Sequence, residues 1–127
     1  MSSGGCYTHH YPICVRRVLV DDTLISMASG GDEPHYSLSF VSYDRPRERA
    51  GFFRFAAVLA DTTSRLFAAR PHWGKYCPID TAAAERLYPQ LPMFRQVCDE
   101  MDKDGVFRNE WVKGLFFANP ISPLKNK

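Results

Sequence analysis

The sequence predicts an α+β fold in which the strands of an antiparallel sheet are packed against helices. Two short segments rich in β-branched and aromatic residues come first, and segments with a helical spacing of apolar residues follow them. With 127 residues, of which 45% are hydrophobic, the chain is long enough to bury one modest core. We therefore expect a single unit over residues 11–117, a flexible N-terminal tail over residues 1–10 and a C-terminal tail over residues 118–127.

The two predicted strands occupy residues 12–20 and 36–43. Because side chains alternate between the faces of a strand, three apolar positions of the first strand share one face. They are Ile13, Val15 and Leu19. Residues 29–34 contain two glycines and a proline and form the clearest turn signal in the chain. We expect the strands to be antiparallel neighbours whose linker is too long for a tight hairpin.

A long helix is predicted from residue 47 to about residue 67, with Asp44 as its candidate N-cap. We expect its apolar stripe to lie on the sheet. The stripe comprises Phe52, Ala56, Leu59, Thr63 and Leu66. Three shorter helical segments follow, namely one capped by Asp80 and stopped at Tyr88-Pro89, one at about 92–101 and one at about 108–115.

The charge of the chain indicates no polyanionic partner. Sixteen basic and fourteen acidic residues leave a net charge of +2, and the basic residues are spread along the chain, so no nucleic-acid partner is predicted. No apolar run approaches the roughly 20 residues that span a bilayer, and the start lacks the pattern of a signal peptide. We expect an intracellular protein of unassigned compartment. The cluster 115–117 is the one segment considered for membrane association, with a docking contact as the favoured alternative.

The four cysteines, at positions 6, 14, 77 and 98, form no Cys-x-x-Cys pair, so reduced thiols are expected. Four residues of the types that bind zinc fall within nine positions: Cys6, His9, His10 and Cys14. Structural zinc sites use paired ligands on two elements, and this spacing does not fit that pattern. We favour an N-terminal tail leading into a strand and predict no metal site.

The segment 70–75, Arg-Pro-His-Trp-Gly-Lys, concentrates two cations, an imidazole and an indole around a turn-forming glycine. Arg70 keeps its charge, Lys75 is a mobile point charge and His72 titrates near neutrality. Such a loop is suited to an electron-rich partner, because it can stabilise negative charge that develops there. The alternative is a surface loop with solvated cations and a tucked-in tryptophan.

This segment resembles a signature near the C-terminus of the FAD-dependent sugar-lactone oxidases, a family that includes gulonolactone, galactonolactone and arabinonolactone oxidases and the alditol oxidases. Other stretches resemble family motifs in the same order across residues 11–117. They are residues 11–16, similar to Pro-Val-Glu-x-Arg; residues 21–26, similar to Asp-x-x-x-Leu-Ser; Leu87-Tyr88-Pro89 with Phe94; and residues 102–109, similar to Asp-Pro-x-Gly-x-Phe-x-Asn. The resemblance implies the end of the cap, or substrate, domain of a vanillyl-alcohol-oxidase-type flavoenzyme.

The resemblance also implies that most of the FAD site lies in another domain. Family enzymes are several times longer, and a glycine-rich loop of their N-terminal domain wraps the pyrophosphate of FAD. Gly4-Gly5 and Gly30-Gly31 are too isolated to form such a loop. The chain therefore looks like the C-terminal part of the enzyme. It is expected to require a flavin-binding domain, in cis or in trans, and to be inactive alone.

In the family, the reaction turns a sugar 1,4-lactone, such as D-arabinono-1,4-lactone, and oxygen into an ascorbate-like product and peroxide. The resemblance implies that Arg16 and Lys75 are catalytic and substrate-binding cations beside a common cavity. His72 is predicted to bind substrate and cofactor with Lys75, and Asn109 to contact the cofactor, with a turn or cap role as the alternative. Cys14 stands where the family has its glutamate, and a mostly neutral thiol is a poor substitute for a carboxylate.

Two other classes of function stay open. Glu100, Asp102, Asp104 and Gly105 fall at positions one, three, five and six of an EF-hand loop, but Trp111 stands where a bidentate glutamate is needed. The other class is a non-catalytic remnant or an interaction module that docks through an exposed apolar face.

Overall fold

The computed structural model describes residues 11–43 and 45–117. Its elements in chain order are strands β1 (Cys14–Val18) and β2 (His35–Ser39), the 3-10 turn η1 (Pro46–Glu48), helices α1 (Ala50–Phe67), α2 (Thr81–Leu87), α3 (Leu91–Met101) and α4 (Glu110–Val112), and the π-helical turn η2 (Lys113–Phe117). This arrangement is consistent with the predicted α+β class. The two expected tails, the zinc candidates Cys6, His9 and His10, and the candidate cap Asp44 lie outside the described residues.

β1 and β2 form the predicted antiparallel pair, in which Val15 lies opposite Leu38. Both strands are shorter than the predicted segments. Their linker turns through Gly30 and Gly31, whose φ angles of 78° and 82° suit residues without a Cβ. Within the linker, the Asp21 N–H donates a hydrogen bond to the Ala28 carbonyl at 3.1 Å, which holds these two parts of the linker together. The structure thus confirms the long connection between the strands.

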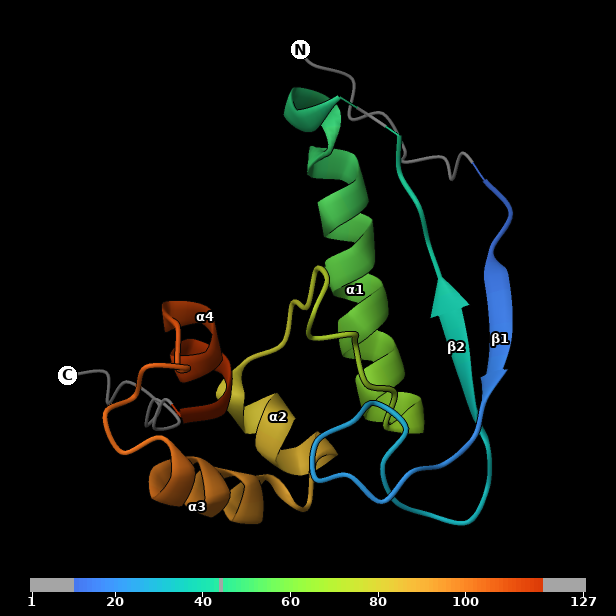
Figure 1. Ribbon diagram of the computed structural model, residues 1–127. Coiled ribbons are helices and arrows are strands. Elements are labelled where there is room, and N and C mark those ends of the chain that lie inside the picture. The colour runs from blue at the N-terminus through green and yellow to red at the C-terminus, as the bar shows by residue number, and fades with distance from the viewer. Residues whose placement is uncertain (1–10, 44, 118–127) are drawn as a thin grey trace, which may run out of the picture.

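Helix α1 stands beside the sheet (Figure 1). One ring contact joins Phe40, just after β2, to Phe55 at a centroid distance of 5.7 Å. Ser64 is the one buried residue of α1, and Leu66, which was expected to face the sheet, is 68% exposed. The predicted packing of the stripe on the sheet is therefore wrong at Leu66, whereas its other four residues are half-buried. At its C-terminus α1 ends on Ala68, a left-handed residue with φ of 51°.

The hydrophobic core lies in the second half of the chain, where α2, α3 and η2 meet. Tyr88, Leu91 and Phe116 are its largest fully buried side chains. Four aromatic rings surround Phe116 in edge-to-face geometry, a favourable arrangement for aromatic pairs. They are Trp73, Tyr88, Phe94 and Trp111. The cluster 115–117, which was considered for membrane association or a docking contact, is largely internal, because Leu115 and Phe116 are buried.

Polar contacts hold the helices around this core. Asp80 caps α2 as predicted, because its carboxylate accepts from the Ala83 N–H at 2.8 Å. Thr81 donates its hydroxyl to the Gly114 carbonyl at 2.9 Å, which ties α2 to η2. Arg95 of α3 donates to the carbonyl of Phe116. No helix among the described residues has the length and apolar character that crossing a membrane requires.

Candidate functional site

Arg70, the first residue of the 70–75 segment, is turned toward the protein and holds the linker that precedes β2. Its Nη1 donates to the Ser29 carbonyl at 2.6 Å, to the Ser29 hydroxyl at 3.0 Å and to the Ser26 carbonyl at 3.3 Å. Its guanidinium lies 5.0 Å from the centre of the buried Tyr88 ring, a cation–π distance. Arg70 therefore links the 26–29 stretch to the core and is not a free cation.

The rest of the 70–75 segment divides between inward and outward side chains. Trp73 donates its Nε1–H to the Ile25 carbonyl at 3.2 Å and packs on the core. His72 is exposed and its Nδ1 accepts from the Gly74 N–H at 3.0 Å, so the neutral ring carries its proton on Nε2. A Cβ at Gly74 would approach the His72 ring to 3.0 Å, which favours glycine there. Lys75 is exposed, and its ammonium has no hydrogen bond or ion pair to any described residue.

Arg16 lies on β1, fully on the surface, and the sheet register shows which residues share its face. Paired residues of neighbouring strands lie on the same face. This face carries Cys14, Arg16 and Val18 from β1 and Ser39, Ser37 and His35 from β2. Cys14 and Arg16 are together, as expected from their spacing. The serines and His35 were missed from the sequence, because their position depends on a register that a long linker does not fix.

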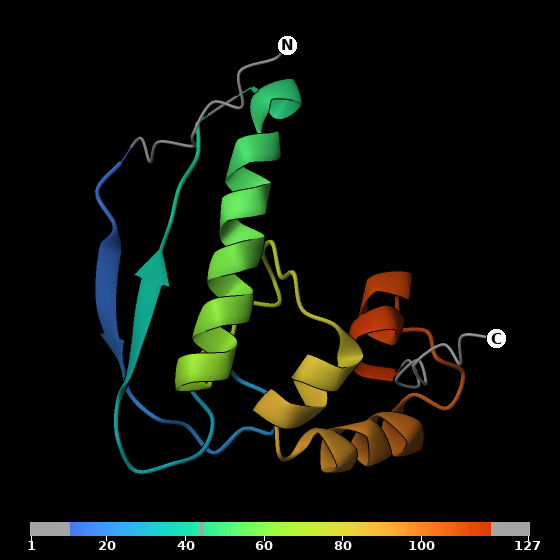
Figure 2. The same ribbon diagram turned by 180° about the vertical axis from the view of Figure 1, so that it is seen from behind.

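The structure does not bring Arg16 and Lys75 together. β1 and the segment between α1 and α2, which contains Lys75, lie on opposite sides of α1 (Figures 1 and 2). Two surface hollows of about 310 and 320 Å³ lie among the described residues, and neither is lined by Arg16, His72, Lys75 or Asn109. Neither hollow is therefore the common cavity expected for these side chains. Their catalytic and binding roles stay predictions.

Asn109 acts as the cap that the sequence offered as its alternative role. Its side-chain oxygen accepts from the Val112 N–H at 2.9 Å at the start of α4. This bond satisfies a backbone donor that a helix N-terminus leaves unpaired. The predicted contact with the cofactor stays a prediction.

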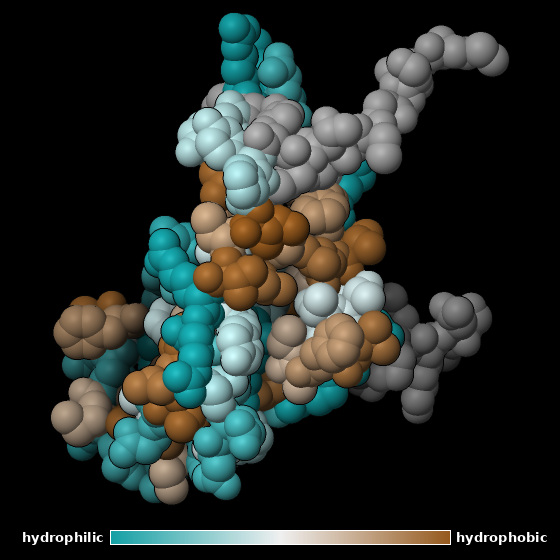
Figure 3. Space-filling model, turned by 90° about the vertical axis from the view of Figure 1, so that its right-hand side faces the viewer, coloured by the Kyte–Doolittle hydropathy of each residue, from teal (hydrophilic) through white to brown (hydrophobic). Residues whose placement is uncertain are grey.

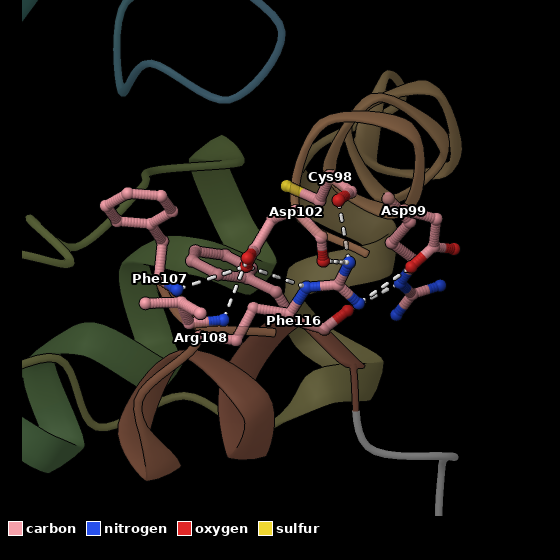
Figure 4. A network of polar contacts seen from close by, with 8 residues as sticks. Cys98, Asp99, Asp102, Phe107, Arg108 and Phe116 are labelled. Carbon is pink, nitrogen blue, oxygen red and sulfur yellow. Dashed lines mark hydrogen bonds and ion pairs between the residues drawn. The ribbon is translucent and has the colours of Figure 1, made fainter. Parts of the chain in front are cut away.

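The acidic stretch 100–105 is organised by protein groups and not as a calcium loop. The Asp102 carboxylate accepts from the N–H groups of Val106 and Phe107 at 2.8 and 3.1 Å (Figure 4). Arg108 lies 3.5 Å from the same carboxylate and donates to Asp99 at 2.7 Å. Among residues 11–43 and 45–117 no group of three His, Cys, Asp or Glu side chains is arranged to hold a metal ion. The EF-hand interpretation is therefore not supported.

The thiols of the second half of the chain are not set up as nucleophiles. Burial raises the pKa of the Cys77 thiol. Burial also raises the pKa of the Cys98 thiol, and the charge of Arg108 opposes this effect only in part. A raised thiol pKa keeps the neutral form at neutral pH, and the thiolate is the reactive form. Neither cysteine thus adds a covalent catalyst to the predicted site.

The paired glycines Gly30 and Gly31 do not form a flavin cradle. A dinucleotide pyrophosphate is held by closely spaced glycines at the N-terminus of a helix. Gly30 and Gly31 instead lie in an open linker before β2, and a Cβ at either would meet no atom within 4 Å. These glycines therefore serve the turn.

Comparison with known proteins gives the chain its relatives. The family model for D-arabinono-1,4-lactone oxidase matches residues 2–115. A "Long-chain alcohol oxidase" from an uncultured marine euryarchaeote is 57% identical over 113 residues, which are 89% of this chain and 24% of that protein. An "L-gulono-1,4-lactone dehydrogenase" from Mycobacterium tuberculosis is 33% identical over 103 residues, 81% of this chain and 22% of that protein. An "L-gulonolactone oxidase" from Scyliorhinus torazame is 27% identical over 109 residues, 85% of this chain and 24% of that protein.

These matches define a class of flavoprotein oxidoreductases named for sugar lactones and alcohols. Within this class, the chain belongs to the D-arabinono-1,4-lactone oxidase family. The resemblance drawn from the ordered motifs is thereby confirmed. The aldonolactone and alditol oxidases of this family are generally FAD-dependent. The chain spans about a quarter of the length of the relatives that match most of it.

Proposed function

We propose that this chain is the C-terminal, substrate-facing part of an FAD-dependent oxidase that acts on the CH–OH group of a sugar 1,4-lactone. The supporting observations are the family match over residues 2–115 and the 57% identical relative, of which this chain covers only 24%. In this proposal FAD is held mainly by polypeptide outside residues 1–127.

Arg16 and Lys75 are proposed to supply positive charge beside the oxygens of the bound substrate, with His72 shaping the same pocket. Neither cation is bound to an acidic partner among the described residues, so both are available to a ligand. Because β1 and the Lys75 loop lie on opposite sides of α1, the proposal requires that they come together when the remaining polypeptide is present.

A second substrate class is supported by one particular relative. The 57% identical protein is named a long-chain alcohol oxidase, and Cys14 replaces the acidic residue of the sugar-lactone motif. A neutral thiol beside Arg16 gives a less polar surface than a carboxylate does. Long-chain primary alcohols are therefore the alternative substrates for the same site.

The test is a chimera in which residues 1–127 replace the matching quarter of the euryarchaeal relative. The purified chimera is scanned for bound flavin and assayed for peroxide with D-arabinono-1,4-lactone, with alditols and with long-chain 1-alkanols. We expect flavin absorbance and oxidation of one of these classes, and Lys75→Met should lower kcat/KM by about 100-fold, as loss of an electrostatic stabiliser does. Lys103→Met, a change of an exposed cation in the turn after α3, is the matched control.

Three outcomes contradict the proposal in different ways. If residues 1–127 alone bind FAD stoichiometrically and oxidise lactone, the dependence on further polypeptide is wrong. A chimera that holds FAD but oxidises none of the substrates indicates a non-catalytic remnant. An active chimera that tolerates Lys75→Met excludes the role proposed for Lys75.

A further inference from the structure

The β1–β2 ribbon has two faces of different chemistry. The face of Arg16 is mainly polar, whereas the opposite face carries Val15 and Arg17 from β1 and Leu38 and Tyr36 from β2. Ile13, which continues the alternation of Val15, is also apolar. The second face, which we call the Val15 face, combines large apolar side chains with a single cation.

The Val15 face is exposed in this chain. Val15, Leu38 and Tyr36 are 62%, 54% and 65% exposed, although such side chains in a strand are usually buried on one face. Apolar side chains gather on the side of the molecule where β1 lies (Figure 3). Single exposed apolar residues are common on soluble proteins, but contiguous groups mark interaction surfaces.

The described part of the chain leaves Val15, Tyr36 and Leu38 of this face more than half exposed. Its core is formed by α2, α3 and η2 around Phe116, and the ring pair of Phe40 and Phe55 links α1 to the chain beyond β2. An isolated two-stranded ribbon is also marginally stable in water. The ribbon therefore needs a covering layer from elsewhere.

We propose that the Val15 face is a docking surface for the remaining polypeptide of a family oxidase, supplied in cis or in trans. This inference rests on the proposed function and names the contact through which the two parts join. About three quarters of the length of the 57% identical relative lies outside its match to this chain, which is ample to cover the ribbon. The covering surface is apolar and places a carboxylate opposite Arg17, since a buried cation needs an anionic partner.

A second copy of this chain is a poorer occupant for a physical reason. A two-fold interface brings the same patch of both copies together. Packing the Val15 face on itself would bring two Arg17 guanidiniums into one apolar layer. Like charges in such a layer repel each other and lose their hydration, which opposes the dimer.

The test is hydroxyl-radical footprinting with residue-level mass spectrometry on the isolated chain and on the chimera described above. We expect Val15, Tyr36 and Leu38 to be oxidised readily in the isolated chain and about fivefold more slowly in the chimera, in proportion to the area lost. Val106 and Met101, which are 76% and 83% exposed on the other half of the chain, should react equally in both. Flavin content and sedimentation are measured on the same samples.

A variant pair gives a second readout. In the chimera Leu38→Glu should abolish the protection of Val15 and Tyr36, whereas Val106→Glu should leave it intact. Because both side chains are exposed in the isolated chain, its circular dichroism should be unchanged by either substitution.

The outcomes separate this inference from the proposed function. Protection without oxidase activity supports the docking surface and counts against the proposed function. Oxidase activity with equally reactive Val15, Tyr36 and Leu38 overturns the docking surface alone. A dimer of the isolated chain in which these residues are already protected assigns the face to a second copy and also overturns it.

Discussion

The regions before and after Arg70 bury their side chains to very different extents. After Arg70, Leu87, Leu91 and Phe116 are each exposed by 3% or less and meet around one aromatic cluster. Before it, all five residues of β1 are exposed. The later region is completed by contacts within the chain, whereas Ile25 and Ala28 are the only buried apolar residues among the described residues before Arg70. The difference shows that a chain can belong to this family although only one of its two regions forms a well-buried core.

The largest expected effect is loss of the aromatic cluster that defines the later region. Phe116→Ala removes a ring that is 1% exposed and contacts four other rings, so unfolding should become easier by about 3–5 kcal/mol. Urea unfolding followed by tryptophan fluorescence measures it, because Trp73 and Trp111 both touch Phe116. Val15→Ala, in the exposed ribbon, should change stability by no more than about 0.5 kcal/mol. Similar losses for both would remove the contrast between the regions.

The next effect concerns the joint between the two regions. Arg70→Ala removes three hydrogen bonds to residues 26 and 29 and the cation over Tyr88, which should cost about 2–3 kcal/mol. Amide exchange in residues 25–29 should accelerate at the same time. Arg70→Lys should restore only part of the stability, because an ammonium lacks the fork geometry. If Lys75→Ala, a change of an exposed residue, destabilises the chain as much as Arg70→Ala does, Arg70 is not the joint between the two regions.

A smaller effect, of opposite sign, is expected inside the later core. The Tyr88 hydroxyl is buried with no hydrogen-bond partner in the structure, so Tyr88→Phe should stabilise the chain by about 1 kcal/mol. Burial also raises the pKa of Tyr88 from 10.0 to about 12. Since the folded state favours the neutral phenol, the raised pKa of Tyr88 contributes stability to the wild type. This contribution is complete below pH 10 and is lost as pH rises through about 12. Denaturant midpoints near both limits should show the loss in wild type and not in Tyr88→Phe.

The smallest effect tests whether Asn109 serves the helix or a cofactor. Asn109→Ala should cost about 1 kcal/mol by removing the cap of α4, and Asn109→Asp should keep the cap. Thermal unfolding of the isolated chain measures both. In the chimera, Asn109→Asp should retain flavin if the cap is the whole role. Loss of flavin from a stably folded Asn109→Asp chimera would instead support the predicted cofactor contact.

Much of the local structure could be predicted from the sequence, because it depends on neighbouring residues. The two strands, the long helix and the Asp80 cap follow from alternation, helical spacing and capping chemistry. The coverage of α1 could not be predicted in the same way. Helical spacing identifies which side of α1 favours burial, but Leu66 is buried only if some other segment reaches it.

The candidate site was less predictable, because its residues are assigned by distant contacts. The composition of the 70–75 segment predicted a turn rich in cations. That Arg70 turns inward depends on carbonyl groups more than 40 residues away, whereas Lys75 finds no such partner among the described residues. The relation of Arg16 to Lys75 also depends on how α1 sits between them, and no short motif encodes that arrangement.

The left-handed backbone of Ala68, just after α1, affects the orientation of the loop that carries His72 and Lys75. An alanine adopts this backbone at a penalty of roughly 1 kcal/mol, and glycine adopts it freely. The reversal that sends the loop back along α1 is therefore stiff as well as strained. A glycine at position 68 would relieve the backbone strain. It would also widen the range of angles at which the chain leaves α1, so the 70–75 loop would be less precisely oriented.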